Sequence, residues 1–262
     1  MGITTLPSRI GLIRPCLESL LDGDRRPDRI VLTLPDGPLL REAEAYDVPG
    51  FVTDHAWHGG LVEIVRPPRD CGPGSKLLGA LATIAEPTVL ILADDDVSYR
   101  RDFVARFAAA QMVSPDRAFS GWTYRCNGLT IGQGCDGFGL WTPHLGGAQA
   151  FLDRCVERTR FVYHDDLWIS FYLALCNVRV TELPAPEGRW YEQNHEVGAL
   201  RYQDGEPERT KLTRDGLDHL IATADMTPAR RVRMLAGRHV GHFVARPVRR
   251  AANRLQRFVR RA

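Results

Sequence analysis

The sequence predicts an α/β fold in which helices cover both faces of a mainly parallel sheet. Short apolar runs alternate with helix-length segments along the first half of the chain, which is typical of βαβ units. The run from Val89 to Ala93 is apolar at every position, which indicates a strand buried on both faces. With 262 residues and 44% apolar content, the chain can form one sizeable core, so we expect a single domain.

The expected strands are short runs rich in Val, Ile, Leu and Thr, and the expected helices carry apolar residues at intervals of three and four. This pattern predicts strands at residues 2–6, 28–34, 61–68, 89–93, 118–125 and 178–183, and helices at residues 9–21, 74–85, 100–113, 148–158 and 164–176. Seven glycines interrupt the alternation between Cys126 and Gly147. Residues 184–216 are rich in proline, glycine and charge, and we expect long loops there.

Charge is divided unevenly along the chain. No acidic residue follows Asp225, whereas eleven arginines lie between residues 230 and 261, so the preceding part carries a net charge of about −9. We therefore divide the chain into a domain at 1–225 and a basic tail at 226–262. From Pro247 the apolar residues recur at helical spacing opposite arginines. This predicts an amphipathic helix suited to an anionic membrane surface, with a solvated or self-docking helix as the alternative. The acidic body disfavours a nucleic-acid partner.

The cysteines indicate a reducing compartment. All six are scattered, with no C-x-x-C pair, so we expect reduced thiols, and a disulfide between Cys126 and Cys135 is the alternative. The first residues do not resemble a secretory leader, and no run approaches the roughly 20 apolar residues of a membrane span. We expect a cytoplasmic protein that binds the inner face of the cell membrane peripherally through its tail.

Three carboxylates, Asp94, Asp95 and Asp96, directly follow the buried apolar run. In open parallel sheets, ligands bind at the carboxyl ends of the strands, and adjacent carboxylates repel one another unless a positive group lies among them. The two flanking acids would hold Mn²⁺ or Mg²⁺, with phosphate oxygens completing the coordination. The alternative is a solvated turn that caps a helix beginning near Arg100.

The segment "LADDDVSY" resembles the D-x-D motif of GT-A fold glycosyltransferases, which ends a central strand and holds the metal that bridges the diphosphate of a nucleotide-sugar. Other segments resemble further parts of that family in the family's order: "ITTLPSR", "DCGPGSKLLGAL", "DGFGLWTPHLGG" and "HDDLWISFYLA". The resemblance covers roughly residues 3–183. It implies a Rossmann-like GT-A sandwich that transfers a sugar from a nucleotide-sugar, UDP-linked, to a hydroxyl of a glycan or lipid-linked acceptor.

The resemblance implies roles for the acids and for a late histidine. Asp94 and Asp96 would be the D-x-D pair, with Asp96 the direct metal ligand and Asp94 nearer the ribose. Asp95 would contact hydroxyls of the donor sugar. His195 would be a further metal ligand, and an ordinary loop histidine is the alternative.

Four residues are expected on the nucleotide side. Lys76 would place a point charge near a phosphate, unless it is a surface lysine. Asp70 would accept from the base or ribose, unless it only shapes a turn. Thr5 and Arg9 follow the first strand, and Arg9 would bind phosphate or stack on the base, unless it only begins a surface helix.

Asp165 and Asp166 are the candidates on the acceptor side. We expect one of them to cap the helix that follows. The other, for which we favour Asp166, would be the general base that deprotonates the acceptor hydroxyl if the enzyme inverts the anomeric centre. In retaining relatives the corresponding acid contacts the substrates instead.

Three other functions fit the sequence less well. A sugar nucleotidyltransferase needs an N-terminal glycine-rich loop, which "TTLPSRIG" lacks. A non-catalytic carbohydrate-binding module would lose the acids at the strand ends. A metal-dependent phosphohydrolase would carry more His and Asp ligands near the motif.

Overall fold

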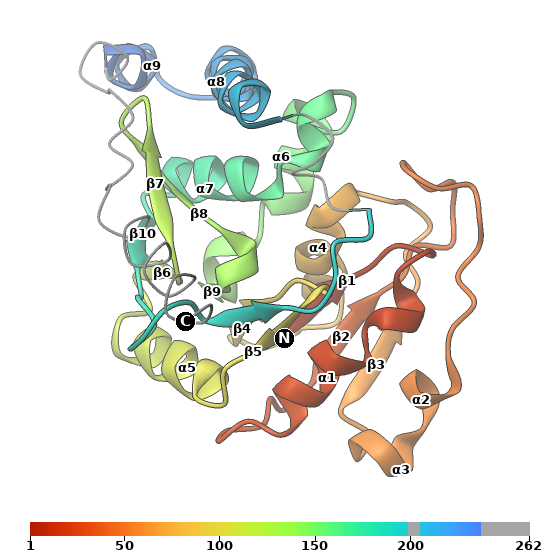
Figure 1. The fold of residues 1–262 in the computed structure, drawn as a ribbon. Helices are drawn as coiled ribbons and strands as arrows, with labels where there is room; N and C mark the ends of the chain where they lie inside the picture. The colour runs from red at the N-terminus through yellow and green to blue at the C-terminus, as the bar shows by residue number, and fades with distance from the viewer. Residues whose placement is uncertain (199–204, 237–262) are drawn as a thin grey trace, which may run out of the picture.

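A seven-stranded sheet forms the centre of the molecule in the computed structural model, which describes residues 1–198 and 205–236 (Figure 1). The strands lie in the order β10-β6-β9-β4-β1-β2-β3. Their bounds are β1 (Gly2–Thr4), β2 (Ile30–Thr33), β3 (Val62–Val65), β4 (Val89–Leu92), β6 (Arg117–Ser120), β9 (Phe138–Trp141) and β10 (Arg179–Glu182). Strand β9 runs antiparallel to its neighbours β4 and β6, and the other pairs in the sheet are parallel. The predicted α/β fold is therefore confirmed.

Helices cover both faces of this sheet. The longer helices are α1 (Arg14–Leu21), α4 (Ser75–Ala82), α5 (Phe103–Val113), α6 (Ala148–Cys155), α7 (Asp165–Leu175), α8 (Gly205–Thr223) and α9 (Pro228–Ala236), and two short ones are α2 (Gly50–Thr53) and α3 (His55–His58). Helices α4, α6 and α7 share one core with Leu90 and Leu92, whereas α1 and α5 share the other with Ile91. Side chains alternate between the faces of a strand, so β4 is apolar throughout because both of its faces are buried.

Two small antiparallel pairs stand outside the central sheet. Strands β7 (Thr123–Cys126) and β8 (Leu129–Gly132) form a hairpin whose turn residues Asn127 and Gly128 both have positive φ, as tight hairpin turns require. The predicted single strand at 118–125 is wrong, because Gly121 separates β6 from β7. A Cβ at Gly121 would lie 2.3 Å from both Trp190 and the Asp136 backbone, so only glycine fits this bend.

The second pair joins distant segments. Strand β5 (Val97–Tyr99) pairs with β11 (Tyr191–Gln193). Strand β5 ends at Tyr99 and a turn at residues 101–102 follows, so α5 begins at Phe103 and not near Arg100. The predicted helix at 9–21 is divided into a 3-10 turn, Ile10–Leu12, and α1. The predicted loops at 184–216 are wrong in part, since β11 and the beginning of α8 lie there.

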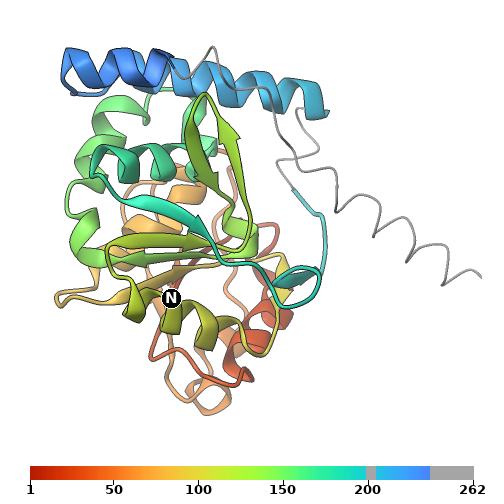
Figure 2. The ribbon, with the colours of Figure 1, turned by 90° about the vertical axis from the view of Figure 1, so that its left-hand side faces the viewer.

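The first residues of the predicted tail pack against the domain. Figure 2 shows α8 and α9 lying across the outer side of α7. Arg230 donates to the carbonyls of Ala174 and Leu175 at the end of α7, and Arg231 donates to those of Ala222 and Ala224. These arginines stabilise helix C-termini. The predicted amphipathic helix after residue 247 lies outside the described residues.

The thiols and the helix lengths bear on two further expectations. Cys126 and Cys135 are both free, so the alternative of a disulfide between them is not realised. Among residues 1–198 and 205–236, no helix is both long enough and apolar enough to cross a membrane.

Candidate active site

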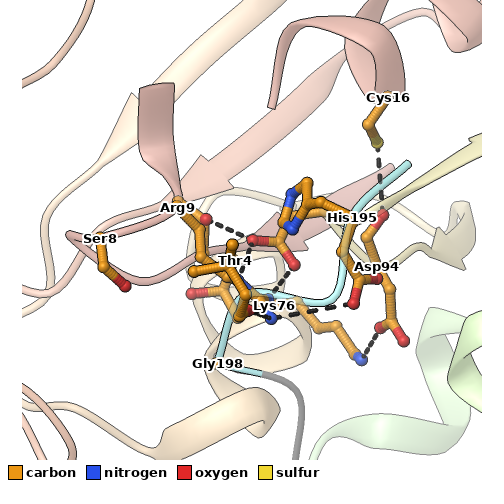
Figure 3. Close-up of polar contacts among 12 residues, drawn as sticks. Thr4, Ser8, Arg9, Cys16, Lys76, Asp94, His195 and Gly198 are labelled. Atoms are coloured by element: carbon orange, nitrogen blue, oxygen red, sulfur yellow. Dashed lines mark hydrogen bonds and ion pairs between the residues drawn. The ribbon is translucent and has the colours of Figure 1, made fainter. Parts of the chain in front are cut away.

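Five carboxylates and two cationic side chains meet at the carboxyl end of β4. Asp94, Asp95 and Asp96 follow the strand, Asp165 and Asp166 begin α7, and Lys76 and Arg9 come from α4 and from the turn after β1. Figure 3 shows Lys76 and Asp94 pointing toward one another, with Arg9 and His195 beside them. The carboxyl ends of parallel strands lie at one edge of a sheet, which is why these segments converge.

The three acids after β4 point in different directions. The side chains of Asp94 and Asp96 are 29% and 16% exposed, whereas that of Asp95 is only 3% exposed. The backbone of this turn is held firmly, because the Asp94 N–H donates to Tyr99 Oη at 2.8 Å and the Asp94 carbonyl accepts from Cys16 Sγ. The two flanking carboxylates thus lie toward the surface, and the middle one lies beneath them.

Asp95 is bound on both oxygens. Arg9 donates to each of them, and the Thr5 hydroxyl donates to Oδ2. Burial raises the pKa of Asp95, while Arg9 opposes this shift. In this structure Asp95 therefore anchors Arg9, and its contact with hydroxyls of a donor sugar stays a prediction. Arg9 does precede the 3-10 turn Ile10–Leu12, but its side chain is only 13% exposed and is directed at Asp95 rather than at solvent.

Arg9 also reaches the segment that follows β11. Its Nη1 atom donates to the Val197 carbonyl at 3.4 Å and lies 3.8 Å from Asp96 Oδ2. Two groups at the end of β11 bind the acidic turn as well. The Asn194 N–H and Gln193 Nε2 both donate to the Asp96 carbonyl at 2.9 Å. The chain after β11 is thereby tied over the acidic turn, an arrangement that no sequence pattern indicated.

His195 lies on this segment with both ring nitrogens buried and without a hydrogen-bond partner. Burial and Arg9 lower its pKa, while Asp96 opposes the shift, so the imidazole is neutral at pH 7. A neutral imidazole whose two ring nitrogens are buried and unpaired suits a metal ligand. Asp96 beside it has a pKa raised to about 6 by burial and by Asp94 and Asp95.

The donor set of Asp94, Asp96 and His195 fits a divalent cation in its chemistry, since carboxylate oxygen and imidazole nitrogen both bind Mn²⁺. Within the part of the chain that the structure describes, however, no three such side chains already converge as a metal-binding group. Asp94 Oδ1 is bonded to Lys76 at 2.6 Å.

Lys76 is buried, so the alternative of a surface lysine is wrong. It is 4% exposed, and its Nζ atom lies 2.6 Å from Asp94 Oδ1 and 2.9 Å from Asp165 Oδ2. Burial alone would lower the pKa of Lys76, but Asp165, Asp94 and Asp166 outweigh it and raise that pKa well above its usual value. The lysine is therefore a permanent cation between the acids of β4 and those of α7.

Asp165 and Asp166 occupy the first turn of α7, and neither caps it. The N-cap residue is His164, which makes no side-chain capping bond, so the expected capping role is wrong. Asp166 Oδ1 instead accepts from the Gly134 N–H at 2.7 Å. Burial and the neighbouring Asp165 raise the pKa of Asp166 to about 8, against the opposing effect of Lys76.

Gly134 is a site residue that the sequence indicated only as one of many glycines. A Cβ at this position would lie 3.0 Å from Asp166 Oδ1 and 3.1 Å from Lys76 Nζ. Asp70, by contrast, lies in the turn that precedes α4. It accepts from the N–H groups of Gly72 and Leu40, which is the turn-shaping role given as its alternative; its contact with a nucleotide stays a prediction.

Comparisons with known proteins address the fold. No family model and no curated protein matches the chain. The mannosyltransferase PcManGT from Pyrobaculum calidifontis, in complex with GDP-Man and Mn²⁺, matches with a TM-score of 0.59 and 16% identity, over 90% of this chain and 68% of that one. S. aureus TarS 1–349 matches with a TM-score of 0.55 and 14% identity, over 90% and 68% of the two chains. Its complex with UDP-GlcNAc matches with a TM-score of 0.53 and 15% identity, over 90% and 70%.

The fold is that of a GT-A glycosyltransferase. The predicted GT-A type of fold is therefore confirmed, and the roles implied by the five sequence segments stay predictions. At 14–16% identity this likeness concerns the fold alone.

Proposed function

We propose that this chain is a metal-dependent glycosyltransferase that moves a sugar from a nucleotide-sugar, UDP-linked, to a hydroxyl of a glycan or lipid-linked acceptor. The observation that carries the proposal is the arrangement of the acids after β4. The flanking Asp94 and Asp96 lie toward the surface, and the middle Asp95 is buried under them. The structures it resembles include one that holds GDP-Man with Mn²⁺ and one that holds UDP-GlcNAc.

Asp94, Asp96 and His195 would hold Mn²⁺ or Mg²⁺. When bound, the metal supplies Lewis-acid neutralisation of the charge on the departing nucleoside diphosphate. The supporting observation from this chain is the pair of unpartnered ring nitrogens of His195, which are buried beside Asp96. A buried polar atom without a partner is costly, and a ligand at this position would remove that cost.

Asp166 would act as the general base of an inverting transfer. The acceptor hydroxyl oxygen attacks the anomeric carbon, its proton passes to the Asp166 carboxylate, and the electron pair of the bond to the diphosphate leaves with the nucleotide. The Gly134 N–H holds one carboxylate oxygen at 2.7 Å, which fixes the orientation of the base. A pKa of about 8 makes Asp166 a stronger base than an ordinary aspartate.

Thr5, Arg9, Asp70 and Lys76 would line the nucleotide side of the site. Asp95 would act through Arg9, with which it is ion-paired, and Thr5 would act through Asp95, to which its hydroxyl donates. The buried cations Arg9 and Lys76 lie within reach of the acids that would hold the metal, so both would also lower the repulsion among five neighbouring carboxylates.

Calorimetry with UDP and Mn²⁺ tests the proposal. Asp96→Ala should abolish the Mn²⁺-dependent part of UDP binding and also sugar transfer. Asp166→Asn should largely keep nucleotide binding but reduce turnover by about 10²–10⁴-fold, the usual contribution of a general base. Unaltered UDP affinity in Asp96→Ala would contradict the assignment. A thermal-shift screen of nucleotide-sugars with and without Mn²⁺ identifies the donor.

A further inference from the structure

Lys76 joins the two acidic parts of the site. It belongs to α4, whereas its partners Asp94 and Asp165 follow β4 and begin α7. Its Nζ atom lies 2.6 Å from Asp94 Oδ1 and 2.9 Å from Asp165 Oδ2. The contact with Asp94 is a hydrogen-bonded ion pair and that with Asp165 is an ion pair. Because Lys76 is only 4% exposed, water and salt compete little for either contact, and each is stronger than a surface ion pair.

Lys76 and the proposed metal compete for the Asp94 carboxylate. Under the proposed function, on which this inference rests, Asp94 and Asp96 hold a divalent cation, yet Asp94 Oδ1 is bonded to Lys76. A divalent cation at Asp94 and the Lys76 ammonium repel each other. The repulsion is smaller if the ammonium has another carboxylate to move toward, and Asp165 already contacts the same nitrogen.

We propose that Lys76 is a positioning residue shared between the donor and acceptor halves of the site, with Asp165 as the partner that draws it away from Asp94 and leaves Asp94 available to a divalent cation. Asp166 has a different bond, since its Oδ1 atom accepts from the Gly134 N–H. Of these two neighbouring carboxylates, Asp165 is the one ion-paired to Lys76. Binding of the nucleotide-sugar and its metal is in this way coupled to α7, the helix that carries Asp166.

The test compares two variants in binding, not in turnover. The measurement is made above pH 8, where Asp166 is ionised. Under that condition Asp165→Asn and Asp166→Asn each remove one negative charge from the same helix end, so both weaken the general attraction for a cation to a similar extent. Asp165→Asn additionally leaves Lys76 with Asp94 as its carboxylate partner. We therefore expect the Mn²⁺-dependent UDP affinity, measured by calorimetry, to fall about tenfold further in Asp165→Asn than in Asp166→Asn. Equal losses would overturn the proposal.

Lys76→Met completes the comparison, and Lys211→Met, which removes an exposed lysine on α8, is its matched control. Without the ammonium, Asp165→Asn should weaken UDP·Mn²⁺ binding no more than Asp166→Asn does. A difference that persists in the Lys76→Met background would overturn the proposal. Circular dichroism checks folding, and if Lys76→Met does not fold, the two aspartate variants decide alone. A parent protein with no Mn²⁺-dependent UDP affinity would instead contradict the proposed function.

Discussion

Arg9 and Asp95 form a doubly bonded ion pair beneath the acidic turn, and the Thr5 hydroxyl completes it. The pair is buried, with 13% and 3% of the two side chains exposed. An ion pair in this position stabilises the fold mainly because neither charge can be left alone. It also leaves Arg9 Nη1 directed at the Val197 carbonyl, so the same pair holds the segment after β11 over the site.

Removing Arg9 should therefore destabilise the protein strongly. We expect Arg9→Ala to lower the free energy of unfolding by about 3–5 kcal/mol, because it leaves the Asp95 carboxylate buried without its cation. Arg101→Ala is the control, since Arg101 pairs with Asp24 on the surface, where both side chains are more than half exposed. That variant should change stability by less than about 1 kcal/mol. Equal urea midpoints for the two variants would show that the buried pair is not structural.

Gly134→Ala should impair turnover more than folding. The new methyl group would lie 3.0 Å from Asp166 Oδ1 and 3.1 Å from Lys76 Nζ, so both charged groups would have to shift by a few tenths of an ångström. We expect kcat to fall about tenfold or more, because a misplaced base loses much of its effect. Gly146→Ala, in the same glycine-rich stretch, meets nothing within 4 Å and should keep kcat. Unchanged turnover in Gly134→Ala would remove Asp166 from the chemistry.

The parts of the fold that the sequence predicted are those in which local pattern and burial agree. Strand β4 lies between two cores and is apolar at every position, so its pattern identifies it directly. The change from apolar residues to three acids, Asp94, Asp95 and Asp96, marks the carboxyl end of this strand. Helix α7 also follows its pattern, and both of its first residues, Asp165 and Asp166, reach the site as expected.

The parts that sequence reasoning missed depend on distant contacts. Strand β5 has three residues, and only its pairing with β11 defines it. Helix α8 contains Pro207 and Gly216, which favour loops in isolation. Gly216 is tolerated because a Cβ there would lie 2.7 Å from Leu167 and 2.9 Å from Phe161, so glycine allows close packing on α7. The Arg9–Asp95 pair belongs to this class too, since each residue alone suggested a ligand contact.

The pH dependence of transfer should follow the ionisation of Asp166. A general base must be ionised, and burial together with Asp165 raises the pKa of Asp166 to about 8. The value of kcat/KM should therefore rise with pH and level off above about 8. Asp165→Asn removes one of the groups that raise this pKa, so its profile should shift to lower pH. A profile that is flat between pH 6 and 9, or that shifts upward in Asp165→Asn, would exclude Asp166 as the base.

Membrane binding should depend on the basic residues beyond the described part of the domain. Arg230 and Arg231 are engaged with helix C-termini, so they contribute little free charge to a lipid surface. The arginines after Ala245, with apolar residues at helical spacing among them, remain the predicted membrane contact. Cutting the chain after Ala245 should therefore abolish co-sedimentation with vesicles containing phosphatidylserine and leave binding to neutral vesicles unchanged. Raised salt should weaken the binding of the full chain, since each basic residue near the surface contributes about 1 kcal/mol at physiological ionic strength. Equal sedimentation of the cut and full chains with anionic vesicles would show that the residues after Ala245 are not the membrane contact. A lipid-linked acceptor would then have to reach the site without help from the tail.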